Sequence, residues 1–237
     1  MRLADTTMIA LTAPIDVIVP TLNAVESLGA SLQSLRRARE AGLIGRLLVV
    51  DGGSTDGTPA VASAFEATVV ASKRGRGHQL ARGAALSSAP WLLFLHADTR
   101  LLSGWEREAT AFIGQGTDRA AAFRLRFDDP SKVARRLERI VEWRARFLGL
   151  PYGDQGLLIS RRVYDQLGGY RDIPLMEDVD LVRRLGRKRL VLLESVAETS
   201  AVRYRNEGHV IRAIKNLVLL SLYFCGVPAR VLVRLYG

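Results

Sequence analysis

The sequence predicts a single α/β domain in which a mostly parallel central sheet carries helices on both faces, followed by a helical C-terminal extension. Three observations predict this fold. Short apolar segments recur along the first half of the chain, segments with helical spacing separate them, and glycine or proline marks the junctions. Continuous apolar strands are typical of a sheet covered on both faces. The strand–helix–strand order implies right-handed crossovers between parallel strands, an arrangement that is Rossmann-like.

The first half alternates four strands with three helices. Each strand is a short apolar or β-branched run, and the first ends at a proline. The first helix has apolar residues three or four positions apart, and the second tolerates a proline in its first turn. In chain order the predicted elements are a strand at Ile15–Pro20, a helix at Ser27–Ala41, a strand at Leu47–Val50, a helix at Thr58–Phe65, a strand at Thr68–Ala71, a helix at Gln79–Leu86 and a strand at Trp91–Leu95.

The second half is less regular, and glycines separate its elements. A glycine-containing loop spans residues 153–156, and a glycine pair at 168–169 ends a short helix. We find no internal repeat, low-complexity tract or linker, so one domain is predicted. In chain order the elements are a strand at Ala120–Phe127, an Arg-rich helix at Lys132–Leu148, a strand at Leu157–Ser160, a helix at Arg161–Leu167, a helix at Glu177–Leu185 and an edge strand at Leu190–Leu193.

Composition restricts the class of protein. The 237 residues are 48% hydrophobic, which is enough to bury a core and excludes a disordered chain. The net charge of +10 attracts phosphate-bearing partners without choosing among nucleic acid, anionic lipid and small phosphorylated molecules. Cys225 is the one cysteine, so intrachain disulfides and cysteine-rich zinc sites are excluded, and a cytoplasmic location is expected. The segment Met1–Pro14 is too weakly apolar for a secretory signal and is predicted to fray.

The C-terminal segment has two interpretations. No apolar run reaches the ~18 residues of a spanning helix. The apolar stretch Leu217–Val227 has Arg212, Lys215 and Arg230 near it, which fits a helix lying on the inner face of a membrane. The alternative is a helix packed on the domain.

Polar residues follow the predicted strands at their carboxyl ends, where ligands bind in parallel α/β sheets. Thr21 and Asn23 follow the first strand, and Asp51-Gly52-Gly53 follows the second. The second motif is either a tight turn whose acids cap a helix or a nucleotide site in which glycines let the ligand approach the backbone. It is neither a Walker loop nor a dinucleotide fingerprint.

A third motif, His96-Ala97-Asp98-Thr99, follows the fourth strand. Mg²⁺ prefers oxygen ligands that it shares with phosphate, and Mn²⁺ also accepts imidazole. Asp98 is therefore a candidate metal ligand and His96 a candidate for Mn²⁺. The structural alternatives are a hydrogen-bonded histidine and a helix cap.

Two further motifs precede helices. Three carboxylates lie in Met176-Glu177-Asp178-Val179-Asp180, where they either complement the helix dipole or include a general base at Asp178. In that case Glu177 and Asp180 hold the local structure or acceptor hydroxyls. The basic segment Ser72–Gln79 is either a solvated loop or a place for a diphosphate.

Taken in order, these motifs resemble glycosyltransferase family 2 with the GT-A fold, over about residues 15–193. The matching segments are Ile18–Asn23, Val50–Thr58, Leu95–Thr99 and Met176–Leu181. A narrower resemblance, based on Gly153–Gly156 and the His-Ala-Asp variant, is to small bacterial members encoded near radical-SAM and selenium-related proteins. The resemblance implies a nucleotide-binding half at about 15–100, an acceptor and catalytic half at about 101–205, and C-terminal helices at about 206–237.

The resemblance also implies roles for individual residues. Asp51 matches the acid that reads the nucleotide base, Asp98 the metal-binding acid, and Asp178, with Glu177 beside it, the catalytic base. Two departures are His96, which replaces an aspartate of the metal motif, and Leu22, which replaces an aromatic residue. The remaining donor-side residues are Pro20, Thr21, Asn23, Gly52, Gly53, Arg76 and Ala97, and the loop residues expected to bind the acceptor are Tyr152, Asp154 and Gln155.

The predicted activity is an inverting transfer of a sugar from a nucleotide-diphosphate sugar, UDP-linked by family default, assisted by Mg²⁺ or Mn²⁺. The acceptor is an unidentified hydroxyl, for which a lipid-linked molecule fits the basic and apolar C-terminus, and the oligomeric state is open to a homo-oligomer. One alternative is a nucleotidyltransferase, although the residues after the first strand lack its glycine-rich basic loop. Another is a nucleic-acid-binding module, for which Arg135–Arg146 with Trp143 and Phe147 is the candidate, but no nucleic acid is expected.

Overall fold

The computed structural model describes residues 13–236, so the prediction of a frayed segment at Met1–Pro14 falls almost wholly outside it. The strands are β1 (Ile15–Thr21), β2 (Ile44–Asp51), β3 (Thr68–Ala71), β4 (Trp91–Phe94), β5 (Thr99–Leu101), β6 (Ala120–Phe127), β7 (Leu157–Ser160) and β8 (Leu190–Thr199). The α-helices are α1 (Val25–Ser34), α2 (Arg36–Glu40), α3 (Thr58–Ala64), α4 (Arg76–Leu86), α5 (Trp105–Gly114), α6 (Lys132–Trp143), α7 (Arg161–Gln166), α8 (Glu177–Leu185), α9 (Val202–Glu207), α10 (His209–Phe224) and α11 (Ala229–Tyr236). A π-helical turn, η1 (Arg144–Leu148), follows α6, and 3₁₀ turns span Gly153–Gln155 (η2) and Arg187–Arg189 (η3).

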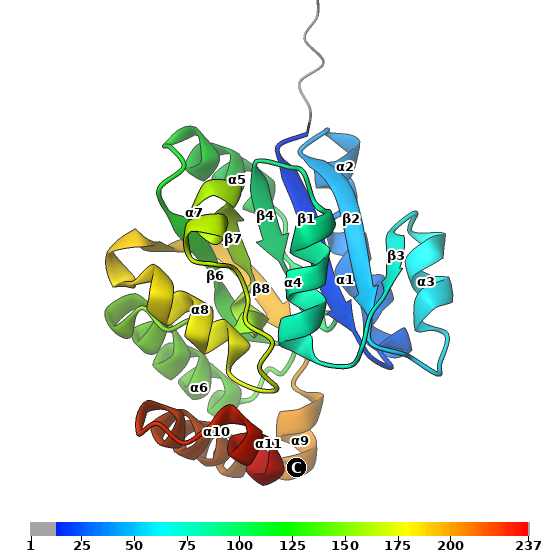
Figure 1. The fold of residues 1–237 in the computed structure, drawn as a ribbon. Coiled ribbons are helices and arrows are strands. Elements are labelled where there is room, and N and C mark those ends of the chain that lie inside the picture. Colours follow the sequence, from blue (N-terminus) through cyan, green and yellow to red (C-terminus); the bar gives the residue numbers. More distant parts are fainter. Residues whose placement is uncertain (1–12, 237) are drawn as a thin grey trace, which may run out of the picture.

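All eight strands form one sheet in the order β3-β2-β1-β4-β7-β6-β8-β5. Four neighbouring pairs are parallel, namely β3·β2, β2·β1, β1·β4 and β6·β8, and the three others are antiparallel. Helices cover both faces of the sheet, and α9, α10 and α11 gather at one end of the molecule (Figure 1). The sequence therefore predicted the α/β class and the mostly parallel sheet correctly.

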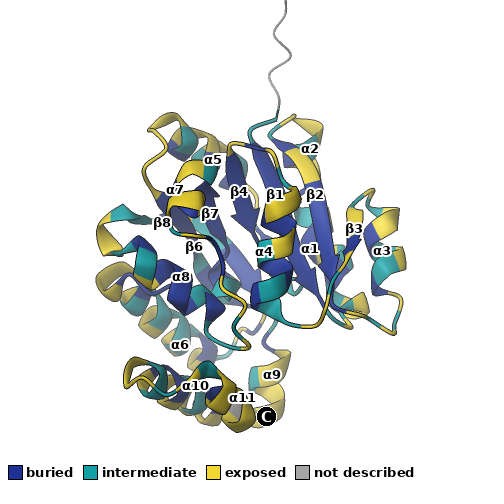
Figure 2. Cartoon of the chain, viewed as in Figure 1, coloured by how far each residue is buried: buried dark blue, intermediate teal, exposed yellow. Residues whose placement is uncertain are grey.

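Two apolar cores explain why helices lie on both faces. Successive side chains of a strand point to opposite faces, and in β1 Val17 belongs to one core while Ile18 belongs to the other. α1 and α5 pack into the first core, and α4 and α8 into the second. Gly83 allows α4 to lie close to the sheet, since a side-chain carbon there would come within 2.5 Å of Ile18 Cγ2. Figure 2 shows the buried strands between these helix layers.

The predicted helix at 27–41 is wrong in one respect, because the structure breaks it into α1 and α2 at Leu35. The Ser34 hydroxyl donates to the carbonyl of Ser31 at 2.6 Å and accepts the backbone N–H of Leu101 in β5 at 3.1 Å. Serine bonding back to the preceding turn bends helices. The tie to β5 therefore ends α1, and α5 and β5 were not predicted.

The predicted edge strand at 190–193 is also wrong. β8 continues to Thr199 and lies inside the sheet, between β6 and β5. Its ladder with β6 is irregular near Arg124, and at that level the N–H groups of Glu194 and Ser195 donate to the Glu108 carboxylate of α5. Because the polar residues Glu194 and Ser195 interrupt the apolar run, the sequence pattern did not predict the second half of β8.

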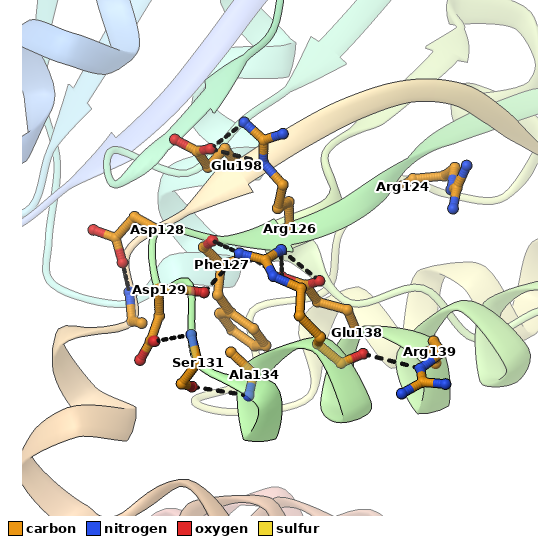
Figure 3. Close-up of polar contacts among 12 residues, drawn as sticks. Arg124, Arg126, Phe127, Asp128, Asp129, Ser131, Ala134, Glu138, Arg139 and Glu198 are labelled. Carbon is orange, nitrogen blue, oxygen red and sulfur yellow. Dashed lines mark hydrogen bonds and ion pairs between the residues drawn. The ribbon is translucent and has the colours of Figure 1, made fainter.

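The end of β6 holds the C-terminal helices. The Asp128 carboxylate accepts the backbone N–H of Ala201 at 2.6 Å and the Arg205 guanidinium at 3.1 Å. Asp129 Oδ2 lies 2.8 Å from His209 Nε2. Figure 3 shows this turn, in which Asp129 and Ser131 also begin α6. Over residues 13–236, none of the helices is both long and apolar enough to cross a bilayer.

Candidate active site

A cleft of about 530 Å³ opens beyond the carboxyl ends of β1 and β4, against the first turns of α4 and α8 and the residues of α9 and α10. Most predicted site residues line it: Pro20, Thr21, Asn23, Arg76, His96, Ala97, Asp98, Tyr152, Asp154, Glu177 and Asp178. Asp51, Gly52, Gly53 and Gln155 are not among the lining residues. Another hollow of about 390 Å³, beside η1 and β8, contains none of the predicted residues.

Asp51 lies one hydrogen bond behind the cleft. Thr21 Oγ1 donates to its Oδ1 at 3.0 Å, and the backbone N–H groups of Gly53 and Ser54 donate to Oδ2 at 3.1 and 2.8 Å. Burial alone would raise the pKa of Asp51, but the bonds from Ser54, Thr21 and Gly53 outweigh it and lower that pKa. The carboxylate therefore stays ionised and orients Thr21, which does line the cleft.

Asn23 joins the loops that follow β1 and β2. Its side-chain oxygen accepts the backbone N–H of Thr55 at 2.9 Å, and its own backbone N–H donates to Ser54 Oγ at 2.8 Å. Asn23 has φ 49° and Met176, at the start of α8, has φ 67°. A left-handed conformation costs about 1–2 kcal/mol for residues other than glycine. Both residues line the cleft, and the strained backbone at Met176 marks the start of α8 as a place where geometry has been favoured over stability.

Gln79 is a site residue that the sequence did not reveal. It lines the cleft, is 4% exposed, and its Nε2 donates to the carbonyls of Thr21 at 2.8 Å and Val50 at 2.7 Å. Gln79 therefore ties the ends of β1 and β2 to α4. Local sequence gives no signal for this role, because the two carbonyls that Gln79 binds lie 58 and 29 positions away in the chain.

The motifs that contain His96 and Asp178 meet at Gly153. The backbone N–H of Gly153 donates to Asp178 Oδ2 at 2.6 Å, and the backbone N–H of Val179 donates to Oδ1 at 2.7 Å. A side-chain carbon at Gly153 would collide with the imidazole of His96. Burial, together with the charges of Arg76 and Arg203, holds the pKa of His96 well below its usual range. The imidazole is therefore neutral at pH 7 and able to ligate a cation.

The three carboxylates at the start of α8 have different surroundings. Glu177 is 2% exposed, and its Oε1 lies 3.4 Å from Arg76 Nη1. Burial raises the pKa of Glu177 in spite of the Arg76 charge. Asp180 is bound by Arg171 at 3.1 Å and Arg184 at 2.6 Å, away from the cleft. Asp178 is the partly exposed carboxylate of the three and faces the cleft.

Two neighbouring residues of η2 have different surroundings: Asp154 faces the cleft and Gln155 is buried in the protein. Asp154 lines the cleft, and its Oδ1 is buried without a hydrogen-bond partner. Burial raises the pKa of Asp154 to about 6. Gln155, predicted to bind the acceptor, does not line the cleft: it is fully buried, its Nε2 donates to the Phe123 carbonyl at 2.9 Å and its Oε1 accepts the N–H of Tyr152.

The C-terminal helices complete the cleft with residues that were not predicted there. These are Arg203 and Tyr204 of α9, Arg212, Asn216 and Leu219 of α10, and Val233 of α11. Asn216 Nδ2 donates to the Tyr204 hydroxyl at 3.2 Å, and burial with the nearby Asp154 charge raises the pKa of Tyr204 to about 12. No local sequence pattern predicts these residues at the cleft. The contacts of Asp128 with Ala201 and Arg205, and of Asp129 with His209, hold α9 and α10 beside the cleft.

The charges that line the cleft suit a phosphate-bearing ligand and a shared cation. Four arginines (Arg74, Arg76, Arg203 and Arg212) and four carboxylates (Asp98, Asp154, Glu177 and Asp178) line it. Within residues 13–236 there is no group of three or more His, Cys, Asp or Glu arranged to hold a metal. A cation held by protein alone therefore does not fit. Asp98 and a neutral His96, which both line the cleft, fit a cation that takes its other ligands from phosphate and water.

The chain matches the family model "Glycosyl transferase family 2" over residues 16–171. PGL/p-HBAD biosynthesis glycosyltransferases of Mycobacterium tuberculosis and Mycobacterium bovis are 36% identical to it over 107 residues. That alignment covers 42% of this chain and 41% of theirs, so it spans about two fifths of these curated relatives.

Solved structures resemble the fold. S. aureus TarS 1-349 in complex with UDP has a TM-score of 0.61 and 16% identity, over 78% of this chain and 60% of that one. Glucosyl-3-phosphoglycerate synthase from Mycobacterium tuberculosis, in complex with Mn²⁺, UDP and glucosyl-3-phosphoglycerate, has a TM-score of 0.61 and 22% identity, over 91% of this chain and 81% of that one.

Proposed function

The chain belongs to glycosyltransferase family 2 and has a GT-A fold, and on this premise we propose that it moves a sugar from a nucleotide-diphosphate sugar to a hydroxyl group. UDP is the favoured nucleotide. TarS has been solved with UDP and UDP-GlcNAc, and glucosyl-3-phosphoglycerate synthase with UDP-glucose and Mn²⁺. The observation that supports the proposal best is that one cleft is lined both by the arginines that suit a diphosphate and by a carboxylate, Asp178, held by two backbone N–H groups.

The donor would lie across the ends of β1 and β2 in this proposal. Thr21 and Asn23 contact the nucleoside, and Asp51 keeps Thr21 in place and remains the candidate for reading the base. Gly52 and Gly53 shape the turn behind them. The guanidinium groups of Arg74, just before α4, and Arg76, its first residue, bind the diphosphate, where charge-assisted hydrogen bonds are strong.

Asp178 is the proposed base of an inverting, single-displacement transfer. It takes the proton of the acceptor hydroxyl while that oxygen attacks the anomeric carbon and the bond to the diphosphate breaks. The N–H groups of Gly153 and Val179 fix the carboxylate orientation, and each oxygen keeps a lone pair for the acceptor proton. Glu177 braces this turn through Arg76, and Tyr152 and Asp154 border the acceptor side of the cleft.

A divalent cation, Mg²⁺ or Mn²⁺, would be held by Asp98 and His96 together with the donor phosphates. When bound, it neutralises the charge that develops on the leaving diphosphate. The chain prepares the site by keeping the imidazole of His96 neutral. The narrower relationship to small bacterial members encoded near radical-SAM and selenium-related proteins stays a prediction.

Thermal unfolding with ligands tests the proposal. A ligand at one hundred times its dissociation constant stabilises a protein by about 2.7 kcal/mol, which for a chain of this size raises the Tm by roughly 5–10 °C. We expect UDP and UDP-sugars to raise the Tm, and Mn²⁺ to increase the shift. We also expect the protein to hydrolyse a UDP-sugar slowly, which releases UDP. A protein that no nucleoside diphosphate stabilises, with or without Mn²⁺, would refute the proposal, and pyrophosphate release from a nucleoside triphosphate would favour the nucleotidyltransferase alternative.

A further inference from the structure

An apolar stripe runs along the outer side of α10, and no described residue covers it. We define the outer stripe as Val210, Ile211, Ile214, Leu217 and Val218. Ile211, Ile214 and Leu217 are 65%, 56% and 62% exposed. Their spacing of three and four residues places them on one side of the helix, and Figure 2 shows the exposure of this end of the molecule. A helix with apolar residues on two sides is normally buried on both.

The second apolar side of α10 is already in use. Leu219 and Leu220 are buried, and Arg212, which is 5% exposed, reaches Glu207 at 2.8 Å. α11 packs beside α10, with Leu232 buried and Val231 and Leu235 exposed. The outer stripe and the exposed Val231 and Leu235 of the adjoining α11 therefore make up an apolar surface that the fold does not need for its own core.

The charges on this surface have one sign. From His209 to the end of the chain the sequence has no aspartate or glutamate, and its basic residues outside the cleft are Lys215, Arg230 and Arg234. Arg230 and Arg234 are exposed, and neither has a carboxylate partner among residues 13–236. The surface thus combines exposed aliphatic side chains with uncompensated positive charge.

The neighbouring helix α6 also exposes basic and apolar side chains, while its acidic side chains face the protein. α6 contacts α10, and its exposed residues include Arg136, Arg139, Ile140 and Trp143. Its acids are turned toward the protein. The Glu138 carboxylate accepts the backbone N–H of Phe127 in β6 at 2.7 Å, as Figure 3 shows, and Glu142 binds Arg124 and Arg146.

We infer that α10 and α11 rest on an anionic lipid bilayer. Aliphatic side chains enter the boundary between head groups and acyl chains, while arginines bind lipid phosphates. A second copy of this chain is a poorer occupant, because the same segment of a partner, from His209 onward, has no carboxylate to pair with Arg230 and Arg234. Nucleic acid offers phosphates but nothing that covers the outer stripe.

Docking would bring the cleft to the bilayer. Arg212, Asn216 and Leu219 line the cleft, whereas the outer stripe lies on the other side of the same helix. This consequence rests on the proposed function: the acceptor hydroxyl would be carried by a lipid, and the donor would reach the cleft from water.

Sedimentation with lipid vesicles tests the inference. We expect the full chain to bind phosphatidylcholine vesicles that contain phosphatidylglycerol, and binding to weaken as salt is raised. The variant Ile214→Glu/Leu217→Glu should bind about tenfold or more weakly, since two buried aliphatic groups are lost. Arg230→Gln/Arg234→Gln should lose the preference for anionic vesicles. Leu86→Glu, which changes a residue of α4 that is 46% exposed, is the matched control and should bind like the parent.

Three results would overturn the inference. They are no binding of the parent to anionic vesicles, equal binding by Ile214→Glu/Leu217→Glu, and a dimer in light scattering that this variant dissociates. The stabilisation by UDP is measured on the same proteins. If UDP stabilises the parent and the variants alike while vesicles are not bound, this inference fails and the proposed function stands. If vesicles are bound but UDP has no effect on the Tm, the membrane inference stands and the proposed function fails.

Discussion

The backbone N–H of Gly153 donates a 2.6 Å hydrogen bond to Oδ2 of Asp178, across 25 positions of sequence. This bond joins the η2 loop to the first turn of α8. There is no room for a side chain at Gly153, because the imidazole of His96 fills the space that its first carbon would occupy. The candidate base, the candidate metal ligand and the acceptor loop therefore depend on one residue without a side chain.

Replacement of Gly153 by alanine should impair transfer while the protein stays folded. The added carbon must push away His96 or Asp178, and misplacement of a catalytic group by about 1 Å can lower turnover about 100-fold. Turnover and the Tm of the two proteins should be compared. Gly114→Ala is the matched control, since nothing lies within 4 Å of the new carbon. Equal turnover in Gly153→Ala and the parent would contradict the prediction.

Asp178→Asn should remove turnover and keep donor binding. The amide preserves the shape but cannot take a proton, so we expect a loss of about 10²–10⁴-fold in turnover. UDP should still raise the Tm of the variant. By contrast, Asp180→Asn, which weakens the contacts to Arg171 and Arg184, should lower the Tm through a loss of about 1–3 kcal/mol. The role of Asp178 fails if its variant transfers sugar at the parent rate.

Asp154 should make the protein less stable as the pH rises. Its pKa is about 6 in the folded chain and about 3.9 when unfolded. Between these values the folded state holds the proton that the unfolded state has lost. Stability is therefore fully present below pH 4, falls by up to about 3 kcal/mol between pH 4 and 6, and stays at the lower value above pH 6.

Asp154→Asn removes this dependence. Without ligands, the variant should have a higher Tm than the parent at pH 8, and the gain should shrink toward pH 4.5. Thermal unfolding across this range checks the prediction, and a constant difference between the two proteins would contradict it. Such a gain would be expected for a residue kept for function at a cost in stability.

Asp128→Ala should loosen the C-terminal helices. The variant loses the bonds from the backbone N–H of Ala201 and from Arg205, which join the end of β6 to α9. Amide hydrogens of α9 and α10 should exchange faster than in the parent, while those of β1 and β2 should exchange at unchanged rates. Glu40→Ala on α2, which removes an exposed ion pair with Arg36, is a control that should change neither.

The sequence determined the α/β class and most of its elements. Strands β3, β6 and β7 and helix α8 have the predicted boundaries, because compact apolar runs and helical periods are local properties. Most of the predicted polar residues also reach one cleft, since the carboxyl ends of parallel strands meet at one edge of a sheet.

Tertiary structure decided which side chain of each motif reaches the cleft and where the C-terminal helices lie. Asp51 turns its oxygens to Thr21 and the following loop, Gln155 turns to Phe123, and Asp178 stays at the cleft beside a buried Glu177. Tyr204 and Arg212 arrive through contacts with the end of β6 that no local pattern contains. Periodicity is set by neighbours in the chain, whereas the direction of a polar side chain depends on partners supplied by distant segments.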